Sequence, residues 1–321
     1  SRSLSLTSLT LVFGWLLMKK LLSRISSAII CLMLSSPDTF FVTSFRTTAV
    51  TSKAGGCLRW LTEAQPENAS FDCVDPVPVL LRGDNFAVVA KPPSIPCHNS
   101  RYIGRARDGP RPLLQRARDT LGQYVNLVHR LDRGASGCVV VGFEKEVTAA
   151  LQDALSKGQK TYYAIVRGEG EKYRSKGWFT VDRDIKDESG DYNSAQTSFL
   201  FLQGSEQPRG CLVQCEPKTG RWHQIRRHLN GLSHPIIGDS THGVSHTNRE
   251  WRTYHGVPYE RICLHLARIH LPETDFTPAI DCICPFPQDM REVISNLPFG
   301  NEVKEKMPEL FHIENPSAFF I

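Results

Sequence analysis

The chain has 321 residues, of which 40% are hydrophobic and 22% charged. This composition suits a folded globular protein and excludes collagen-like, coiled-coil and wholly disordered chains. The formal net charge is +5, and residues 1–56, with six basic side chains against one acid, carry all of that excess. Residues 57–321 are therefore neutral overall, so any nucleic acid that they bind must contact a local basic patch.

Residues 1–60 have the composition of a targeting presequence. Met18-Lys19-Lys20 precedes a short apolar run, Leu21–Leu34, as in a signal peptide. The run Val42–Thr48 is acid-free and hydroxyl-rich, as in a transit peptide. The two together indicate a bipartite plastid presequence, with a mitochondrial presequence or a translated upstream region as alternatives. Basic residues interrupt the apolar run, so we expect no membrane span and no membrane association of the mature protein.

The folded domain is expected to span residues 73–315. Val79–Leu81 and Phe86–Ala90 are apolar runs separated by the turn-forming Gly83-Asp84-Asn85, which is typical of two strands joined by a turn. Residues 99–119 are polar, rich in arginine and contain two prolines, so they are predicted to form a long loop or insertion.

A buried strand and a helix follow. Cys138–Phe143 is a continuous apolar run, as expected for a buried strand. In Glu144–Ser156 apolar side chains recur every four residues, which predicts an amphipathic helix, and Gly158 stands where a C-terminal cap is expected.

The second half of the domain contains more predicted strands than helices. A helix is expected over Trp222–Leu232, and the predicted strands are Thr161–Val166, Gln196–Phe201, Cys211–Cys215 and Cys263–Leu271. Because the strands and helices do not alternate in βαβ order, we predict an α+β fold with a mixed, mainly antiparallel sheet and flanking helices.

Most of the ten cysteines lie in apolar runs, which favours buried, reduced thiols over a disulfide framework. A zinc site would require paired C-x-x-C units. The spacings Cys282-x-Cys284 and Cys211-x3-Cys215 do not supply them.

The first candidate for chemistry is the run His129–Gly137, in which Asp132 lies between Arg130 and Arg133 just before the predicted buried strand. Neighbouring cations keep a carboxylate ionised, and an ionised carboxylate on a loop held by a core strand can act as a nucleophile. A salt-bridged surface turn would have the same pattern.

Two further runs contain candidate residues. Tyr162 lies in the strand Thr161–Val166, where it could stack on a base or pack in the core. In Thr219–His228 a turn leads into a helix and carries three arginines, Arg221, Arg226 and Arg227, whose fork geometry suits phosphate or carboxylate partners.

Taken in order, these segments resemble a known family. The patterns are H-R-L-D-x-x-x-S-G from His129, K-x-Y-x-A-x-V-x-G from Lys160, and T-G-R-x-H-Q-I-R-x-H from Thr219 with a later P-I-x-G-D. They resemble the RluA-type RNA pseudouridine synthases, and Lys91-Pro92 and the run Leu264–Ala267 resemble two further elements of that family. The run from Gly238 to Arg249 resembles the TruC-like, tRNA-modifying branch.

The resemblance implies an enzyme that isomerises uridine to pseudouridine in tRNA or rRNA. It implies that Asp132 is the nucleophile, that Tyr162 packs on the target base, and that Arg226 pairs with the aspartate. RNA contacts are expected from Arg130, Arg133, Arg221, His223 and Arg227. No metal or organic cofactor is implied, and we expect a monomer.

Two positions depart from the family pattern, which usually has Thr in place of Ala135 and Gly in place of Ser94. Three alternatives stay open. The first is a catalytically silent family member that acts as an RNA-binding or folding factor. The others are a metal-dependent hydrolase that uses His223, His228, His234 and His242, and a serine hydrolase built on Ser136, which lacks a G-x-S-x-G elbow.

Overall fold

The chain folds around a ten-stranded sheet, seen in a computed structural model that describes residues 75–98 and 110–312. The described residues belong to one compact unit, Gln65–Ile321. The predicted presequence, residues 1–60, lies outside the described residues, as does the stretch 99–109.

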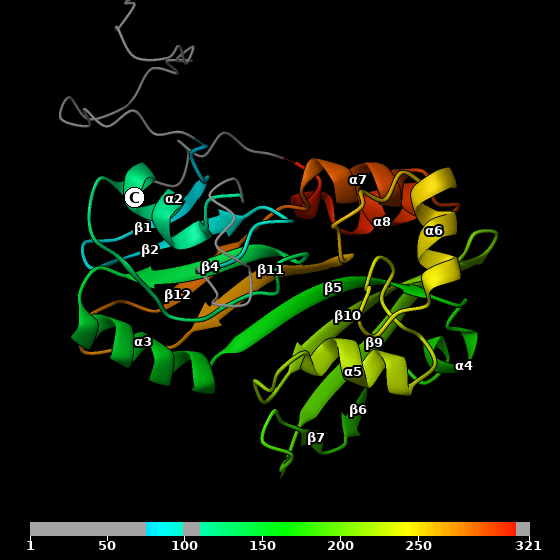
Figure 1. Ribbon diagram of the computed structural model, residues 1–321, viewed down its shortest axis with the longest axis horizontal. Helices are drawn as coiled ribbons and strands as arrows, with labels where there is room; N and C mark the ends of the chain where they lie inside the picture. The colour runs from blue at the N-terminus through cyan, green and yellow to red at the C-terminus, as the bar shows by residue number, and fades with distance from the viewer. Residues whose placement is uncertain (1–74, 99–109, 313–321) are drawn as a thin grey trace, which may run out of the picture. The chain divides into compact units, whose positions relative to one another are not determined.

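The sheet is mixed and mainly antiparallel, as predicted (Figure 1). Across it the strands follow the order β1 (Val79–Arg82), β2 (Phe86–Lys91), β4 (Ser136–Gly142), β11 (Leu264–Leu271), β5 (Gln159–Arg167), β10 (Arg209–Pro217), β9 (Gln196–Glu206) and β6 (Phe179–Asp182). Two short strands complete it: β3 (Asn126–Leu127) pairs with β4, and β12 (Ile280–Ile283) pairs with β11. The strands β7 (Ile185–Lys186) and β8 (Tyr192–Asn193) form a separate hairpin.

The parallel pair β4–β11 lies at the middle of the sheet. Every residue of β4 is buried, which explains its uninterrupted apolar sequence. Its first residue, Ser136, pairs with His265 of β11. The loop that enters β4 is therefore anchored at the centre of the fold.

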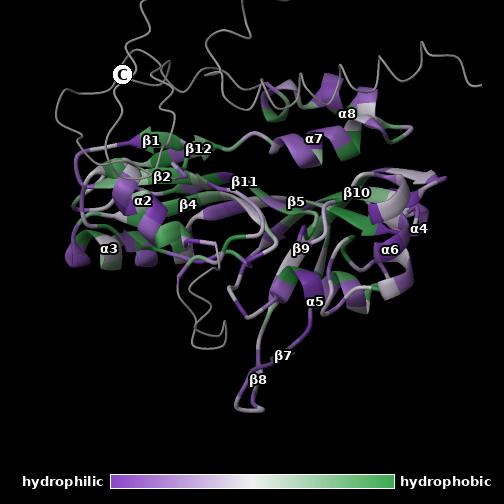
Figure 2. Cartoon of the chain, turned by 45° about the horizontal axis from the view of Figure 1, so that its top comes forward, coloured by the Kyte–Doolittle hydropathy of each residue, from purple (hydrophilic) through white to green (hydrophobic). Residues whose placement is uncertain are grey.

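Helices cover both faces of the sheet. In Figures 1 and 2, α7 (Gln288–Ser295) and α8 (Gly300–Lys306) lie on one side, while α3 (Lys145–Lys157) and α5 (Gln224–Gly231) lie on the other. The remaining helices of the described residues are α2 (Leu113–Leu121), α4 (Glu171–Arg174), α6 (Ser245–Tyr254) and the 3₁₀ turn η2 (Pro308–Leu310).

The prediction of a loop over residues 99–119 is wrong for its last part, because α2 begins at Leu113. Leu113, Ala117 and Leu121 recur every four residues and face the core, and Gly122 ends the helix with a φ of 68°. The arginines between these positions made the segment look like a polar loop.

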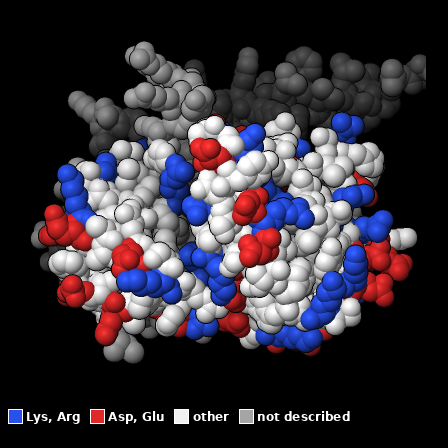
Figure 3. Space-filling model, turned by 90° about the horizontal axis from the view of Figure 1, so that it is seen from below, with Lys and Arg blue, Asp and Glu red and all other residues white. Residues whose placement is uncertain are grey.

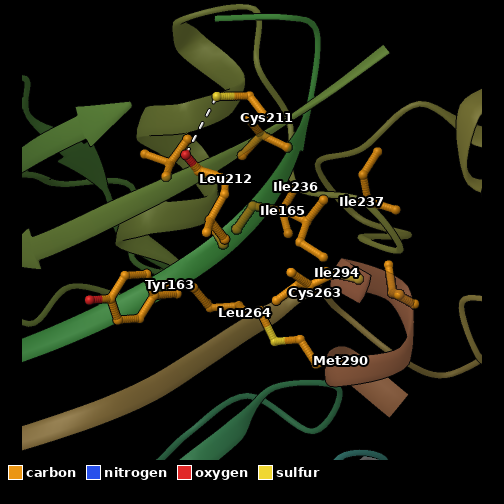
Figure 4. Packing of buried hydrophobic residues seen from close by; sticks show 14 of the residues in the cluster. Tyr163, Ile165, Cys211, Leu212, Ile236, Ile237, Cys263, Leu264, Met290 and Ile294 are labelled. Carbon is orange, nitrogen blue, oxygen red and sulfur yellow. Dashed lines mark hydrogen bonds between the residues drawn. The ribbon is translucent and has the colours of Figure 1, made fainter. Parts of the chain in front are cut away.

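Two apolar clusters form the core. One joins β5 and β10 to α7, and Figure 4 shows Ile165, Leu212 and Met290 within it. The other joins β2 and β4 to α2 and α3. Tyr162 packs against both clusters.

The seven cysteines in the described part of the chain are buried and free, as expected. Within the described residues, no helix is long and apolar enough to cross a membrane.

Candidate active site

The loop that carries Asp132 runs from β3 to β4, and hydrogen bonds from the Lys91 side chain hold it in place. The Lys91 ammonium donates hydrogen bonds to the carbonyl oxygens of Arg133 (3.0 Å) and Ala135 (2.7 Å), and to that of Pro92 (3.0 Å). Lys91 is 1% exposed, and its burial lowers the pKa of the ammonium to about 8. This side chain therefore fixes the backbone on the C-terminal side of Asp132.

Glycine is required at two places in this loop because other backbone passes close by. A Cβ atom on Gly134 would lie 2.7 Å from the Glu260 carbonyl oxygen, and one on Gly137, whose φ is 126°, would lie 2.2 Å from the Leu266 carbonyl oxygen. Ser94, which stands where the family pattern has glycine, adopts a φ of 69°. The left-handed backbone explains why glycine suits that position.

Arg226 joins two carboxylates. Its Nη1 donates to Asp132 Oδ2 (2.9 Å), while Nε and Nη2 donate to the two oxygens of Asp239 (both 2.7 Å). The side chain of Asp239 is 0% exposed and that of Arg226 is 3% exposed, whereas that of Asp132 is 28% exposed. The buried pair thus presents a cation to a carboxylate that remains open to solvent and to a substrate.

The contacts between Arg226 and Asp239 keep both side chains charged. Burial acts to raise the pKa of Asp239, but hydrogen bonding to Arg226 outweighs it and holds that pKa below its ordinary value. Burial acts to lower the pKa of Arg226, but its two carboxylate partners raise it. Both groups are therefore ionised at neutral pH.

The turn before α5 positions Arg226. Gln224 Oε1 accepts hydrogen bonds from the Arg221 backbone N–H (3.0 Å) and the Thr219 hydroxyl (2.7 Å). Its Nε2 donates to Gln196 and Thr197 of β9 (both 2.9 Å). Because Gln224 is buried and Arg226 follows two residues later, β9 fixes the start of the helix that carries the arginine.

Tyr162 enters the site from β5. Burial is the main cause of its raised pKa, and the negative charge of Asp132 is the next. The phenol therefore stays protonated at neutral pH. Of the three residues predicted to be catalytic, Arg226 donates a hydrogen bond to Asp132, and the charge of Asp132 acts on Tyr162.

His223 lies beside Asp132 as well. Its Nε2 is 3.7 Å from Asp132 Oδ1, the oxygen that Arg226 leaves free. Its Nδ1 shares a hydrogen bond of 3.0 Å with His242 Nε2, and Trp222 stacks on its ring at 3.9 Å. Burial lowers the pKa of His223 to about 4, so the imidazole is neutral at neutral pH.

Of the four arginines predicted to contact RNA, Arg130 and Arg133 lie on the Asp132 loop, and Arg221 and Arg227 lie in the turn before α5 and in α5. Arg133 pairs with Glu260 at 3.0 Å, Arg221 donates to the Ser194 carbonyl oxygen, and Arg227 donates to the Lys186 carbonyl oxygen. Arg130 is exposed on the Asp132 loop. Figure 3, seen from the side of α3 and α5, shows Lys and Arg side chains across this face with Asp and Glu among them.

The histidines considered as metal ligands do not converge. His223 and His242 touch, but His228 bonds Thr197 and the Arg183 carbonyl oxygen, and His234 bonds the Arg167 carbonyl oxygen. Among the described residues, no group of three or more His, Cys, Asp or Glu side chains has the arrangement of a metal site. Ser136 is 1% exposed and bonded to His265 and Arg261.

The sequence did not predict the roles of Asp239 and His242, although both lie in the run from Gly238 to Arg249 that resembles the TruC-like branch. Asp239 Oδ1 accepts hydrogen bonds from the backbone N–H groups of Thr241 and His242 (both 2.9 Å). The sequence Gly238-Asp239-Ser240-Thr241-His242 is typical of such a turn, because an Asp side chain can accept hydrogen bonds from the backbone that follows it. That the turn meets Arg226 could not be inferred without the fold.

Replacing Lys91 with Met is expected to lower the free energy of unfolding by about 2–5 kcal/mol, because three loop carbonyls lose their donor while the shape is kept. Urea unfolding measures the loss. The matched control is Lys145→Met, at an exposed position on α3. If both variants unfold at the wild-type urea concentration, Lys91 does not hold the loop.

Comparison with known proteins gives two kinds of match. Residues 85–231 match the family model described as RNA pseudouridylate synthase. tRNA pseudouridine synthase C of Vibrio cholerae is 34% identical over 179 residues, covering 49% of this chain and 70% of that protein. The protein of the same name from Pasteurella multocida is 38% identical over 175 residues, covering 49% and 71%.

Solved structures share the fold. Human RNA Pseudouridylate Synthase Domain Containing 1 superimposes with a TM-score of 0.51 at 21% identity, covering 70% of this chain and 87% of that chain. Human RNA Pseudouridylate Synthase Domain Containing 4 superimposes with a TM-score of 0.51 at 20% identity, covering 68% and 91%.

Proposed function

The chain belongs to the RluA-type family of RNA pseudouridine synthases, on the TruC-like branch, and we propose that it acts through Asp132 as the nucleophile. The protein isomerises uridine to pseudouridine in RNA. The readings as a silent RNA-binding factor or a hydrolase are not favoured, because the family match is to an isomerase.

One observation carries the assignment to Asp132. Its carboxylate receives one hydrogen bond from Arg226, whose charge is already anchored by the buried Asp239, and its other oxygen is free to approach a substrate. A nucleophile needs this combination of a fixed position, a nearby cation and an open face. Tyr162, on strand β5, supplies an aromatic side chain on which the target base can pack.

The reaction breaks the bond between N1 of the base and C1′ of the ribose and joins C5 to C1′ instead. Asp132 attacks the target nucleotide, and the hydrogen bond from Arg226 orients the attacking carboxylate. The target uridine must leave the base stack to reach the carboxylate of Asp132. Arg130, Arg133, Arg221 and Arg227 then contact the phosphates around it.

We propose tRNA as the substrate class, on the strength of the relatives named tRNA pseudouridine synthase C. We also propose that the protein acts as a monomer. Pseudouridine mapping of tRNA and rRNA from cells with and without the gene tests the tRNA assignment. Loss of a pseudouridine from rRNA alone would contradict it.

We also propose that residues 1–60 direct the protein to an organelle, the plastid ahead of the mitochondrion, and that the mature form has no membrane anchor. The segment is basic and hydroxyl-rich, and the family match begins later, at residue 85. Fusion of residues 1–60 to a fluorescent protein tests this targeting role directly. A fusion that stays in the cytosol contradicts it.

Deleting residues 1–60 is expected to leave the turnover rate and its salt dependence unchanged. The alternative is that the basic segment binds RNA and compensates for a neutral catalytic domain. In that case the truncated protein should bind RNA more weakly, with a flatter dependence of affinity on salt. RNA affinities of the two forms at low and moderate salt distinguish the two roles.

A further inference from the structure

The free oxygen of Asp132 faces a pair of histidines. His223 Nε2 lies 3.7 Å from Asp132 Oδ1, and the side chain of His223 is 14% exposed. On its other side, His223 Nδ1 shares a hydrogen bond of 3.0 Å with His242 Nε2. If His223 donates through Nδ1, its Nε2 is an unprotonated acceptor that points towards the nucleophile.

The histidine pair is built into the same network as Arg226. The backbone N–H of His242 donates to Asp239 Oδ1 (2.9 Å), and Asp239 in turn receives two hydrogen bonds from Arg226. Arg226 then contacts Asp132 Oδ2. A closed ring of contacts therefore fixes the position of His223 relative to both oxygens of Asp132.

The backbone conformation of His223 supports this arrangement. Its φ is 53°, in the left-handed region that non-glycine residues rarely adopt. Trp222 covers one face of the imidazole with an interplanar angle of 21°. A left-handed residue at the start of α5 therefore turns its ring into the site instead of towards solvent.

Burial keeps the imidazole of His223 neutral. Burial is the largest effect and lowers its pKa to about 4; the charges of Arg226 and His242 also lower it, while Asp132 and Asp239 raise it. Burial likewise lowers the pKa of His242. A neutral imidazole next to the nucleophile can accept a proton, whereas it would contribute little to holding phosphate.

The reaction requires such an acceptor. When C5 bonds to C1′, C5 still carries its hydrogen, which must leave as a proton, and N1 gains a proton after its bond to C1′ has broken. No electrons are lost or gained overall. Loss of the C5 proton restores the conjugation of the ring, so even a weak base is sufficient.

We propose that His223 is a further catalytic residue, which accepts the C5 proton beside Asp132 and shares it with His242. This assignment rests on the proposed role of Asp132 and goes beyond RNA contact, the role expected for His223 from the sequence. His242 is partly exposed, so it offers the proton a route to solvent.

The test compares the wild-type protein with His223→Gln on a tRNA transcript that the wild type modifies, made with uridine or with 5-deuterouridine. We expect kcat of the variant to fall by about 10²- to 10³-fold at neutral pH with little change in KM. We also expect the deuterium effect on kcat to exceed that of the wild type, since removal of the C5 proton becomes rate-limiting.

A second variant controls for folding. His223→Gly suits the left-handed backbone and leaves a space the size of an imidazole. Added imidazole is expected to restore its activity in proportion to the free-base concentration, whereas His270→Gln, at a side chain that is 55% exposed, should behave as the wild type.

The assignment is overturned if His223→Gln stays within tenfold of the wild type. It is equally overturned if the variant is slow but has the wild-type isotope effect and imidazole does not rescue His223→Gly. The parallel wild-type reaction separates the two claims. Pseudouridine in that reaction leaves the proposed function standing, whereas its absence from every tRNA tested overturns both.

Discussion

Asp132→Asn is expected to reduce pseudouridine formation by at least about 10⁴-fold, as removal of a nucleophile does in other enzymes. The substitution removes the charge and keeps the shape. Arg226 retains its two hydrogen bonds to Asp239, so the fold should survive, and RNA affinity should change little because Asp132 is a single, partly exposed acid. Single-turnover rates and RNA binding measure the two effects separately.

The control for this change is Asp153→Asn, at a side chain that is 64% exposed and pairs with Lys157 on α3. It should have wild-type activity. If Asp132→Asn retains activity within tenfold of the wild type, a barrier change of about 1.4 kcal/mol, Asp132 is not the nucleophile.

Arg226→Met is expected to have the second largest effect, on both stability and rate. It leaves Asp239, which is 0% exposed, without its cation, and the expected loss in the free energy of unfolding at neutral pH is about 3–5 kcal/mol. Asp132 also loses its contact with Arg226, and a misplaced catalytic group lowers the rate by at least about 100-fold.

The pH dependence of this loss has a defined sign. In the wild type the pKa of Asp239 is lowered, so its contribution to stability is present above the pKa of the unfolded chain and is lost as pH falls through the folded value. Without Arg226 the buried carboxyl binds a proton more readily. The difference in stability between variant and wild type should therefore shrink on acidification, which urea unfolding at several pH values measures.

Arg226→Lys is the matched variant, because it keeps the charge but lacks the fork that reaches both carboxylates. It should be more stable than Arg226→Met and still slow. Wild-type stability of Arg226→Met at neutral pH would mean that Arg226 does not neutralise Asp239 and serves RNA phosphate instead of the carboxylates.

The sequence was sufficient to predict the central strands and the pairing of Arg226 with Asp132. Cys138–Phe143 is apolar throughout because β4 is buried on both faces, and Asp132, Tyr162 and Arg226 each lie in a recognisable motif. Helices α6, α7 and α8 were not predicted. Helix α6 is mostly polar, and its buried residues are Asn248 and Trp251, so its sequence lacks the recurring apolar residues that predict a helix.

Apart from the pairing of Arg226 with Asp132, which the family resemblance implied, the contacts between motifs could not be predicted, because they depend on how the sheet orders its strands. Strand β11 lies between β4 and β5, although more than 90 residues separate it from either in the chain. That order, together with the turn before α5, places Asp132, Tyr162 and His223 in one site. The pairing of Arg226 with Asp239 and of His223 with His242 follows from it.

The most direct test of uridine isomerisation through Asp132 is nucleoside analysis of unmodified tRNA transcripts incubated with purified residues 61–321. Wild-type protein is expected to convert a specific uridine to pseudouridine with no change in RNA mass, while Asp132→Asn converts none. Equal conversion by both proteins would contradict the role of Asp132, and absence of pseudouridine from every transcript treated with the folded wild-type protein would contradict the proposed tRNA activity.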